Sequence, residues 1–316
     1  MQYKVSIKRK CYLLSVLLMT VWLTGCVQEE FESTPSPAGN GIRFTLTVPD
    51  VNLPSVSSRT MTGTGTAKKE DEIETVDILV FDMSKTPAVF LEWVSATGVT
   101  QDLADNSTVS FSAVLSPTTA STCIVVVANK ELDNIVSGFT KGATTKVEAM
   151  EKMLHTQTGK WLADGSTTGG YTRIPMYGEK VISKITPSMD PITGINMKRM
   201  LARIDIRNNS ATSNFTVDEV YLANYNTTGY IAPAWNTNGQ VTDPVPDTPV
   251  LPAGSGKMTE EGDAIRYSVN GNTPYDGEIY TFESLAAEDA GGAGADGEAS
   301  RKDATCLFGY GRSGTG

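Results

Sequence analysis

The stretch that decides the fold is Ile42-Arg43-Phe44-Thr45-Leu46-Thr47-Val48, in which apolar and polar residues alternate without a break. Successive side chains of a β-strand point to opposite faces, so this period of two predicts a strand with one buried face. Four apolar side chains would lie on that face: Ile42, Phe44, Leu46 and Val48. Proline has no N–H to donate to a sheet, and Pro49 and Pro54 therefore end the strand.

Short runs of similar character recur along the rest of the chain. Some alternate in the same way, and others are more continuously apolar. The predicted strands are Val76–Phe81, Val109–Val114, Cys123–Ala128, Val181–Ile185, Arg199–Ile206, Val217–Ala223, Ile265–Val269 and Glu278–Phe282. The density of β-branched residues in Cys123–Ala128 predicts a central strand there.

One helix is predicted, over Thr145–Leu154. Thr145 can cap it, Glu148 stands three residues later as in a capping box, and one face is apolar. Short strands separated by turn residues, with a single helix, predict an all-β protein of β-sandwich architecture. The prolines around residue 190 predict a boundary there, and hence two tandem domains, residues 42–190 and 191–316.

The first 25 residues have the features of a secretory leader. A basic segment with Lys4, Lys8, Arg9 and Lys10 precedes an apolar run that ends at Leu23. That run is about 13 residues long, shorter than the roughly 20 that cross a bilayer. The following Leu23-Thr24-Gly25-Cys26 resembles the bacterial lipobox, which implies cleavage before Cys26 and attachment of lipid to it. The alternative is an ordinary signal peptide that happens to hold a cysteine.

Residues 26–41 are predicted to form a flexible acidic tether, since they combine Glu29, Glu30 and Glu32 with Ser, Thr and Pro. Acidic residues just after a lipidated cysteine resemble the signal that sends Bacteroidetes lipoproteins to the cell surface. The predicted location is therefore the outer membrane, facing outward.

Charge and cysteine content argue against nucleic-acid binding, a disulfide framework and a cysteine metal cluster. The formal net charge of −10 disfavours binding to nucleic acid, which requires clustered Lys and Arg. Of the four cysteines, Cys11 would leave with the leader and Cys26 would take the lipid. The remaining pair, Cys123 and Cys306, forms neither a disulfide framework nor a metal cluster.

The remaining candidate chemistry is weak, so no cofactor, metal or catalytic residue is predicted. The single histidine, His155, would lie at the end of the predicted helix, where cationic residues are common. Gly309-x-Gly311-x-x-Gly314 matches a dinucleotide fingerprint in letters but is followed by no helix. The acidic runs Glu70-Asp71-Glu72 and Glu260-Glu261 are predicted to be solvated faces.

Several of these stretches, in this order, resemble the fimbrillin family, the fimbrial subunit proteins of type V pili in Bacteroidales. They are Leu23–Cys26, Ile42–Val48, Ser58-Arg59-Thr60, Val76–Asp82, Val125–Lys130, Ile174–Gly178, Arg199–Ile206 and Ile279–Glu283. The resemblance implies two tandem transthyretin-like β-sandwiches that polymerise into pili and support adhesion. Its partners would be other fimbrial subunits, an arginine-specific protease, and the outer membrane through the lipid.

The resemblance also implies a role for the first strand. Ile42, Phe44, Leu46 and Val48 would fill a groove in the precursor, and the segment 42–59 would detach after cleavage at Arg59. Arg59 follows a small-residue loop suited to proteolysis, whereas Arg43 lies inside the strand and should be protected. The alternative is a permanent edge strand followed by an ordinary surface arginine.

The C-terminal part departs from the family pattern. Fimbrillins continue with further strands after a segment like Thr305–Gly311, whereas this sequence stops at Gly316. We therefore expect an incomplete second domain, or a subunit that anchors or caps a fibre.

The second hypothesis is a surface lipoprotein that does not polymerise and binds glycans or host protein. Loops with Trp161, Trp235 and Tyr230 could offer aromatic stacking platforms for such a ligand.

Overall fold

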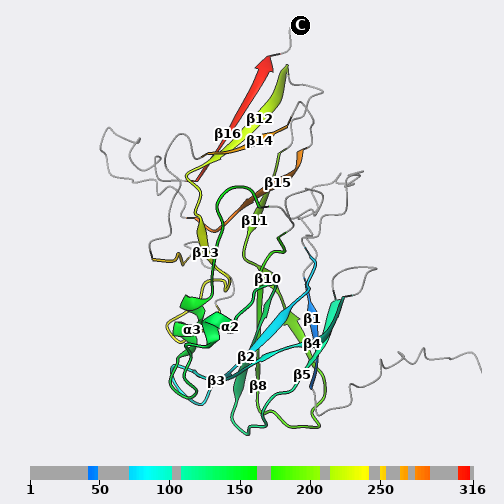
Figure 1. The fold of residues 1–316 in the computed structure, drawn as a ribbon, viewed down its shortest axis with the longest axis vertical. Helices are drawn as coiled ribbons and strands as arrows, with labels where there is room; N and C mark the ends of the chain where they lie inside the picture. Colours follow the sequence, from blue (N-terminus) through cyan, green and yellow to red (C-terminus); the bar gives the residue numbers. More distant parts are fainter. Residues whose placement is uncertain are drawn as a thin grey trace, which may run out of the picture. The chain divides into compact units, whose positions relative to one another are not determined.

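A computed structural model describes residues 42–48, 71–101, 108–161, 172–206, 214–241, 250–253, 264–269, 275–284 and 305–313 (Figure 1). All of them belong to one compact unit, Asn40–Gly316. The described part of the chain is built mostly of strands in several sheets, with two short helices, so the predicted all-β class is confirmed.

The first sheet has four strands in the order β4-β5-β1-β9. Their bounds are β4 Thr97–Gln101, β5 Thr108–Ala113, β1 Ile42–Thr47 and β9 Ile192–Asn196. β1 is antiparallel to β5 and parallel to β9, so it is an inner strand of this sheet. β1 therefore lies beside a strand that follows about 150 residues later in the sequence. Two parallel neighbours cannot be joined by a tight turn, because the chain has to cross back over the sheet between them.

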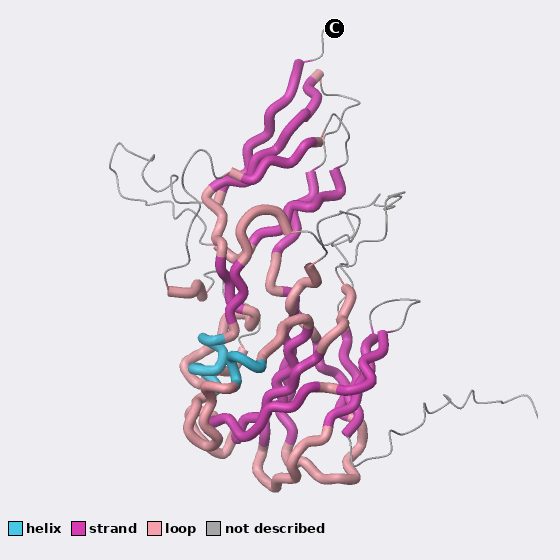
Figure 2. The backbone as a smooth tube through the Cα atoms, in the orientation of Figure 1, coloured by secondary structure: helices cyan, strands magenta, loops and turns pink. Residues whose placement is uncertain are grey.

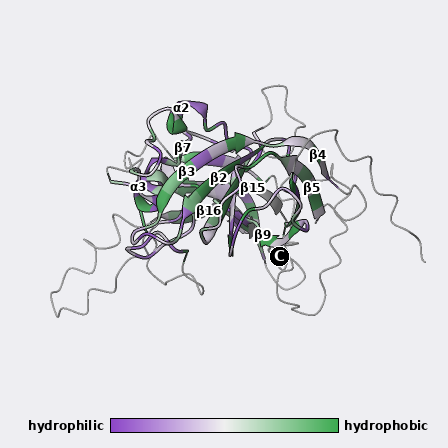
Figure 3. Cartoon of the chain, turned by 90° about the horizontal axis from the view of Figure 1, so that it is seen from below, coloured by the Kyte–Doolittle hydropathy of each residue, from purple (hydrophilic) through white to green (hydrophobic). Residues whose placement is uncertain are grey.

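The second sheet has five antiparallel strands in the order β10-β8-β6-β2-β3. Their bounds are β10 Lys198–Arg199, β8 Met176–Ile182, β6 Thr122–Ala128, β2 Val76–Asp82 and β3 Val89–Ser95. Every residue of β6 is buried, so the prediction of a central strand is confirmed. Figure 3 shows the hydrophobic colour along β2 and β5, which contribute inward side chains from the two sheets.

Two cores use the opposite faces of the second sheet. Ile78 and Val126 point into a core shared with the first sheet, whereas Leu79 and Val125 point into a second core. The second core is covered in part by α2 (Asp133–Val136) and α3 (Lys146–Lys152), which are the two helices of Figure 2. Burial on both faces explains why Ile78–Phe81 of β2 and Cys123–Ala128 of β6 are continuously apolar rather than alternating.

The predicted helix is confirmed as α3, with a capping box in which the Thr145 side chain accepts from the Glu148 N–H. It ends at Lys152, earlier than predicted, because Leu154–Thr156 forms β7 and pairs with β13 (Thr228–Tyr230). His155 therefore lies in a strand, and its predicted place at a helix end is wrong.

The remaining strands form two small sheets around a third core. β11 (Ala202–Ile206) pairs with β15 (Tyr275–Thr281), and β12 (Phe215–Ala223) lies between β14 (Ile265–Ser268) and β16 (Cys306–Ser313). Val220, Leu222 and Tyr267 are central to this core.

Candidate functional site

The candidate site is β1 with the two strands that hold it. The edge position in the alternative is wrong, because the β5 register runs from Ile42↔Ala113 to Thr47↔Thr108 on one side, and β9 pairs with β1 on the other. Whether β1 is permanent stays a prediction. We call the surface that β1 covers the β1 groove. It is lined by Val109, Phe111, Ala113, Ile192 and Ile195.

Burial along β1 follows the alternation of its sequence. The four apolar side chains are at most 4 % exposed: Ile42, Phe44, Leu46 and Val48. The residues between them are exposed or half-buried. Full burial of such a side chain contributes about 1.5–3 kcal/mol, so β1 is a substantial part of the first core. The predicted alternating strand is confirmed, and its detachment stays a prediction.

One contact between β1 and the groove is a stack of two aromatic rings. The rings of Phe44 and Phe111 stack with centroids 5.0 Å apart and an interplanar angle of 7°. On the β9 side the register shifts between the partners of Phe44 and Leu46, where Gly194 has φ +70°. A residue with φ > 0 in a bulge suits glycine, which has no Cβ to clash.

Gln101 and Asn129 fix the segment 71–75, which directly precedes β2, and we call these two side chains the amide clamp. Gln101 accepts from the Ile73 N–H at 3.1 Å and donates to the Asp71 carbonyl at 2.7 Å. Asn129 accepts from the Glu74 N–H at 3.0 Å and donates to the carbonyls of Glu72, at 2.8 Å, and Ile174, at 3.0 Å. The clamp therefore satisfies backbone groups of a segment that is not itself in a sheet.

Two arginines reinforce the same segment. Arg173 pairs with Glu72 at 3.3 Å and Glu74 at 2.5 Å, and Arg199 pairs with Asp71. Asp71 and Glu72 are about one-third exposed, so the prediction that this acidic run is a plain solvated face is wrong for these two residues. The sequence offered no signal for either partner, since both lie about 100 residues or more away.

The end of β1 and the amide clamp lie at the same end of the first sheet. Gln101 is opposite Val109 in β5, and Val109 is opposite Leu46 in β1. Val48 follows β1, and Asp71 is held by Gln101 of β4, so the two described residues that flank positions 49–70 are held at the two strands on either side of β5. Cys26 and Arg59 lie outside the described residues. Arg43 is exposed on β1, opposite Ser112.

A buried lysine, Lys146, fastens residues 239–241 to the second sheet. Its Nζ lies 2.6 Å from Glu179 Oε2 and donates to the Gly239 carbonyl at 2.5 Å. Glu179 also accepts from Tyr177 at 2.5 Å and from the Val241 N–H at 3.3 Å. Burial, and then the charge of Glu179, raises the pKa of Tyr177. This network was not predicted, because a lysine in an amphipathic helix usually faces water.

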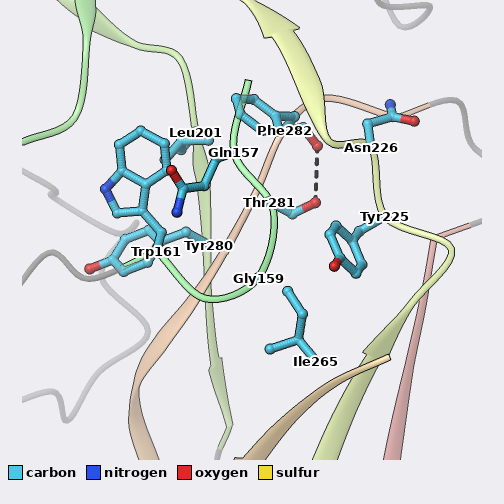
Figure 4. Close-up of a pocket in the computed structure, with 10 residues that line it drawn as sticks. All are labelled: Gln157, Gly159, Trp161, Leu201, Tyr225, Asn226, Ile265, Tyr280, Thr281 and Phe282. Carbon is cyan, nitrogen blue, oxygen red and sulfur yellow. Dashed lines mark hydrogen bonds between the residues drawn. The ribbon is translucent and has the colours of Figure 1, made fainter. Parts of the chain in front are cut away.

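The aromatic residues of the second hypothesis do not form an open platform. Trp161 is only 2 % exposed and donates from its indole N–H to the Thr172 carbonyl at 2.9 Å. Figure 4 shows it beside Tyr280 at a small pocket, across from Tyr225. Trp161 as a stacking platform is therefore wrong.

Tyr230 and Trp235 contact each other edge to face, with centroids 4.8 Å apart. Trp235 also packs against the second core, so this pair is part of the fold.

His155 has the environment of a structural residue. It lies 4.9 Å from Trp161 and 6.4 Å from Phe282, measured between ring centroids. Burial, and then the nearby charge of Lys130, lowers its pKa to about 4. The imidazole is thus kept neutral by burial beside two aromatic rings, which is the environment of a core side chain.

The other candidate groups are also structural. Gly309 and Gly311 lie in β16, whereas the first glycines of a dinucleotide fingerprint lie in a turn that opens a helix. Cys123 is a buried free thiol whose pKa burial raises to about 12. Within the described residues, no group of three or more His, Cys, Asp or Glu side chains could hold a metal ion. Nor is any helix in that part of the chain long and apolar enough to cross a membrane.

The sequence matches the profile of the family described as major fimbrial subunit protein (FimA) over residues 42–245. No curated protein matches it. A candidate cell adhesion protein from Parabacteroides distasonis shares 17 % identity over 79 % of this chain and 73 % of its own, with a TM-score of 0.45. A fimbrial assembly protein from the same organism shares 11 % identity over 85 % of each chain, with a TM-score of 0.38.

The matched range contains the β1 groove, the amide clamp and both sheets of the first core. The fimbrial resemblance drawn from the sequence is thereby confirmed. Because the match spans well over half of the chain, the protein belongs to the major fimbrial subunit (FimA) family and has a structural, non-enzymatic role in fimbriae at the cell surface.

Proposed function

We propose that this chain is a fimbrial subunit that is anchored by lipid as a precursor and assembled by protease-triggered exchange of β1. The observation that carries the proposal is the inner position of β1 between β5 and β9. Its removal would leave an apolar groove flanked by unpaired backbone groups, which is an unstable arrangement. A strand of a neighbouring subunit can satisfy both needs by β-augmentation.

Repeated addition in one direction then produces a fibre. An interface between the groove of one subunit and a strand of the next is heterologous, so it does not close on itself. Such a fibre would present many copies of the subunit at the cell surface and support adhesion.

The lipid anchor is proposed at Cys26, on the strength of the lipobox-like Leu23–Cys26. Residues 26–41 would act as the acidic tether that carries the folded body outside the outer membrane. Two or more acyl chains give stable anchoring where one chain is marginal.

Arg59 is the proposed cleavage site for an arginine-specific protease. It belongs to the connection between β1 and the clamped segment 71–75, so a cut there separates β1 from the rest of the chain. Arg43 is a poorer substrate, because its backbone is part of a strand paired on both sides.

Two tandem sandwich domains remain the proposed organisation, with the boundary moved. β9 and β10 follow residue 190 but pair with β1 and β8, so a boundary after Arg199 keeps both N-terminal sheets whole. The third core, with β11, β12, β14, β15 and β16, would then belong to the second domain.

The test is treatment of the purified protein, beginning at Cys26, with an arginine-specific protease. We expect a new N-terminus at Thr60 by intact mass, loss of residues 42–59, and a ladder of oligomers by size-exclusion chromatography. Arg59→Lys should abolish all three changes, and the matched variant Arg43→Lys should behave as the unmodified protein.

A protein that stays monomeric and retains residues 42–59 after treatment contradicts strand exchange. That outcome would favour a fibre anchor, a cap, or a surface lipoprotein that does not polymerise and binds glycans or host protein.

A further inference from the structure

We propose that Phe111 sets the register of the strand in the β1 groove, because it accepts an aromatic ring only at the position of Phe44. The inference rests on the proposed function for the identity of the later occupant, which is a strand of a second copy of this chain. It adds a sequence requirement for that strand.

The pair is distinctive within the first core. Phe44 and Phe111 are its only aromatic residues among the part of the chain that the structure describes, and they are 1 % and 4 % exposed. They face each other directly in the β1–β5 register, and their rings are nearly parallel. Direct cross-strand aromatic pairs contribute more than the area that they bury.

Alternation alone does not fix the register of this strand. A shift by one residue would turn the polar face inward, and burial forbids it. A shift by two residues keeps the apolar face inward and would place Phe44 opposite Val109 or Ala113. Only the ring stack on Phe111 distinguishes these registers on the β5 side, so Phe111 carries information that the alternating pattern lacks.

The other side of the groove supports the same register. β9 changes register between the partners of Phe44 and Leu46, with Gly194 at the irregularity. A strand shifted by two residues would therefore also meet the bulge at the wrong position.

The outward face defines the rest of the occupant. Arg43, Thr45 and Thr47 lie opposite Ser112, Ser110 and Thr108, which are small and polar. The groove thus fits an alternating strand that runs in the same direction as β1, antiparallel to β5. That strand should carry polar residues at these three outward positions.

The first test uses a labelled peptide of residues 40–48 as the probe, bound to protein that has been cleaved at Arg59 and freed of β1. A peptide with Phe44→Leu and Leu46→Phe has the same composition but carries the ring two residues away. We expect it to bind roughly three- to tenfold more weakly, in line with the loss of an aromatic pair. In protein with Phe111→Val the two peptides should differ by about twofold or less.

Equal binding of the two peptides by the unmodified groove would overturn the register proposal while leaving strand exchange intact. If β1 is never released after cleavage, the proposed strand exchange is contradicted. The register proposal is then tested by the unfolding of the intact chain.

In the intact chain, we expect Phe44→Leu with Leu46→Phe to lower the urea midpoint of unfolding. Adding Val109→Phe and Phe111→Val moves the facing ring by the same two residues and should restore part of that loss. An unchanged midpoint for the first pair would overturn the proposal without any dependence on cleavage.

Discussion

His155 lies half-buried between the rings of Trp161 and Phe282, and its pKa is lowered from 6.5 to about 4. The cause is first burial, which disfavours the charged imidazolium, and then the charge of Lys130. The unfolded chain therefore binds a proton near pH 6.5, whereas the folded chain does not until about pH 4. Stability from this group is complete above pH 6.5 and falls as the pH decreases toward 4.

We expect His155→Leu to remove this part of the acid sensitivity. The loss of unfolding free energy between pH 7 and pH 4.5 should be smaller in the variant by roughly 1–2 kcal/mol, a figure already reduced for partial solvent exposure. Urea unfolding of both proteins at the two pH values measures the difference. Equal pH dependence in both proteins would show that the imidazole titrates normally in the fold.

At the scale of single residues, the sequence predicted burial better than partners. The alternation of Ile42–Val48 correctly gave the inward side chains, because a strand has a fixed period of two. It could not give the stack of Phe44 on Phe111, nor the pairing of Lys146 with Glu179. Such contacts depend on which strands become neighbours, and that is a property of the whole sheet.

Asn129 directly follows β6 and has φ 59°, and its side chain makes three hydrogen bonds to the backbone at Glu72, Glu74 and Ile174. We expect Asn129→Ala to lower the free energy of unfolding by about 3 kcal/mol, from lost hydrogen bonds and the cost of positive φ. Asn129→Gly tolerates that φ and should lose roughly 1 kcal/mol less. Chemical denaturation measures both.

Asn134→Ala, at an exposed position of α2, is the matched control and should change stability by less than about 0.5 kcal/mol. The clamp also predicts a local effect, namely faster hydrogen exchange at the Glu74 amide in Asn129→Ala, since that amide donates to the Asn129 side chain. An Asn129→Ala protein as stable as the control would mean that the amide clamp is not needed to hold the segment 71–75.

At the scale of elements, apolar runs and a capping motif correctly predicted two central strands and the start of one helix. The apolar runs gave β2 and β6, and the capping box gave the start of α3. β3 was missed, although most of Val89–Ser95 is apolar. β4 and β9 were not predicted either, because Thr97–Gln101 is mostly polar and Ile192–Asn196 contains Gly194 at a bulge. Both strands are held by their neighbours in the first sheet rather than by their own propensity.

At the scale of the molecule, the question is whether β1 can leave without unfolding the rest. β2 and β6 pair with each other and with β3 and β8, so none of their backbone partners belongs to β1. Their other face packs into the second core, which contains no residue of β1. The amide clamp holds the chain just before β2. Unfolding that follows the removal of β1 and its connection should therefore not extend past the clamp into β2.

Hydrogen exchange of the cleaved, β1-free protein therefore should show two classes of amide. Those of β5 and β9 that face β1 should lose protection, because their partners have gone, whereas those of β2 and β6 should keep it. The uncleaved Arg59→Lys protein supplies the reference rates, and adding the peptide of residues 40–48 should restore protection in β5 and β9. A uniform loss of protection would mean that β1 is integral to a single cooperative unit, and a subunit that unfolds on losing its first strand could not present a preformed groove to the next one.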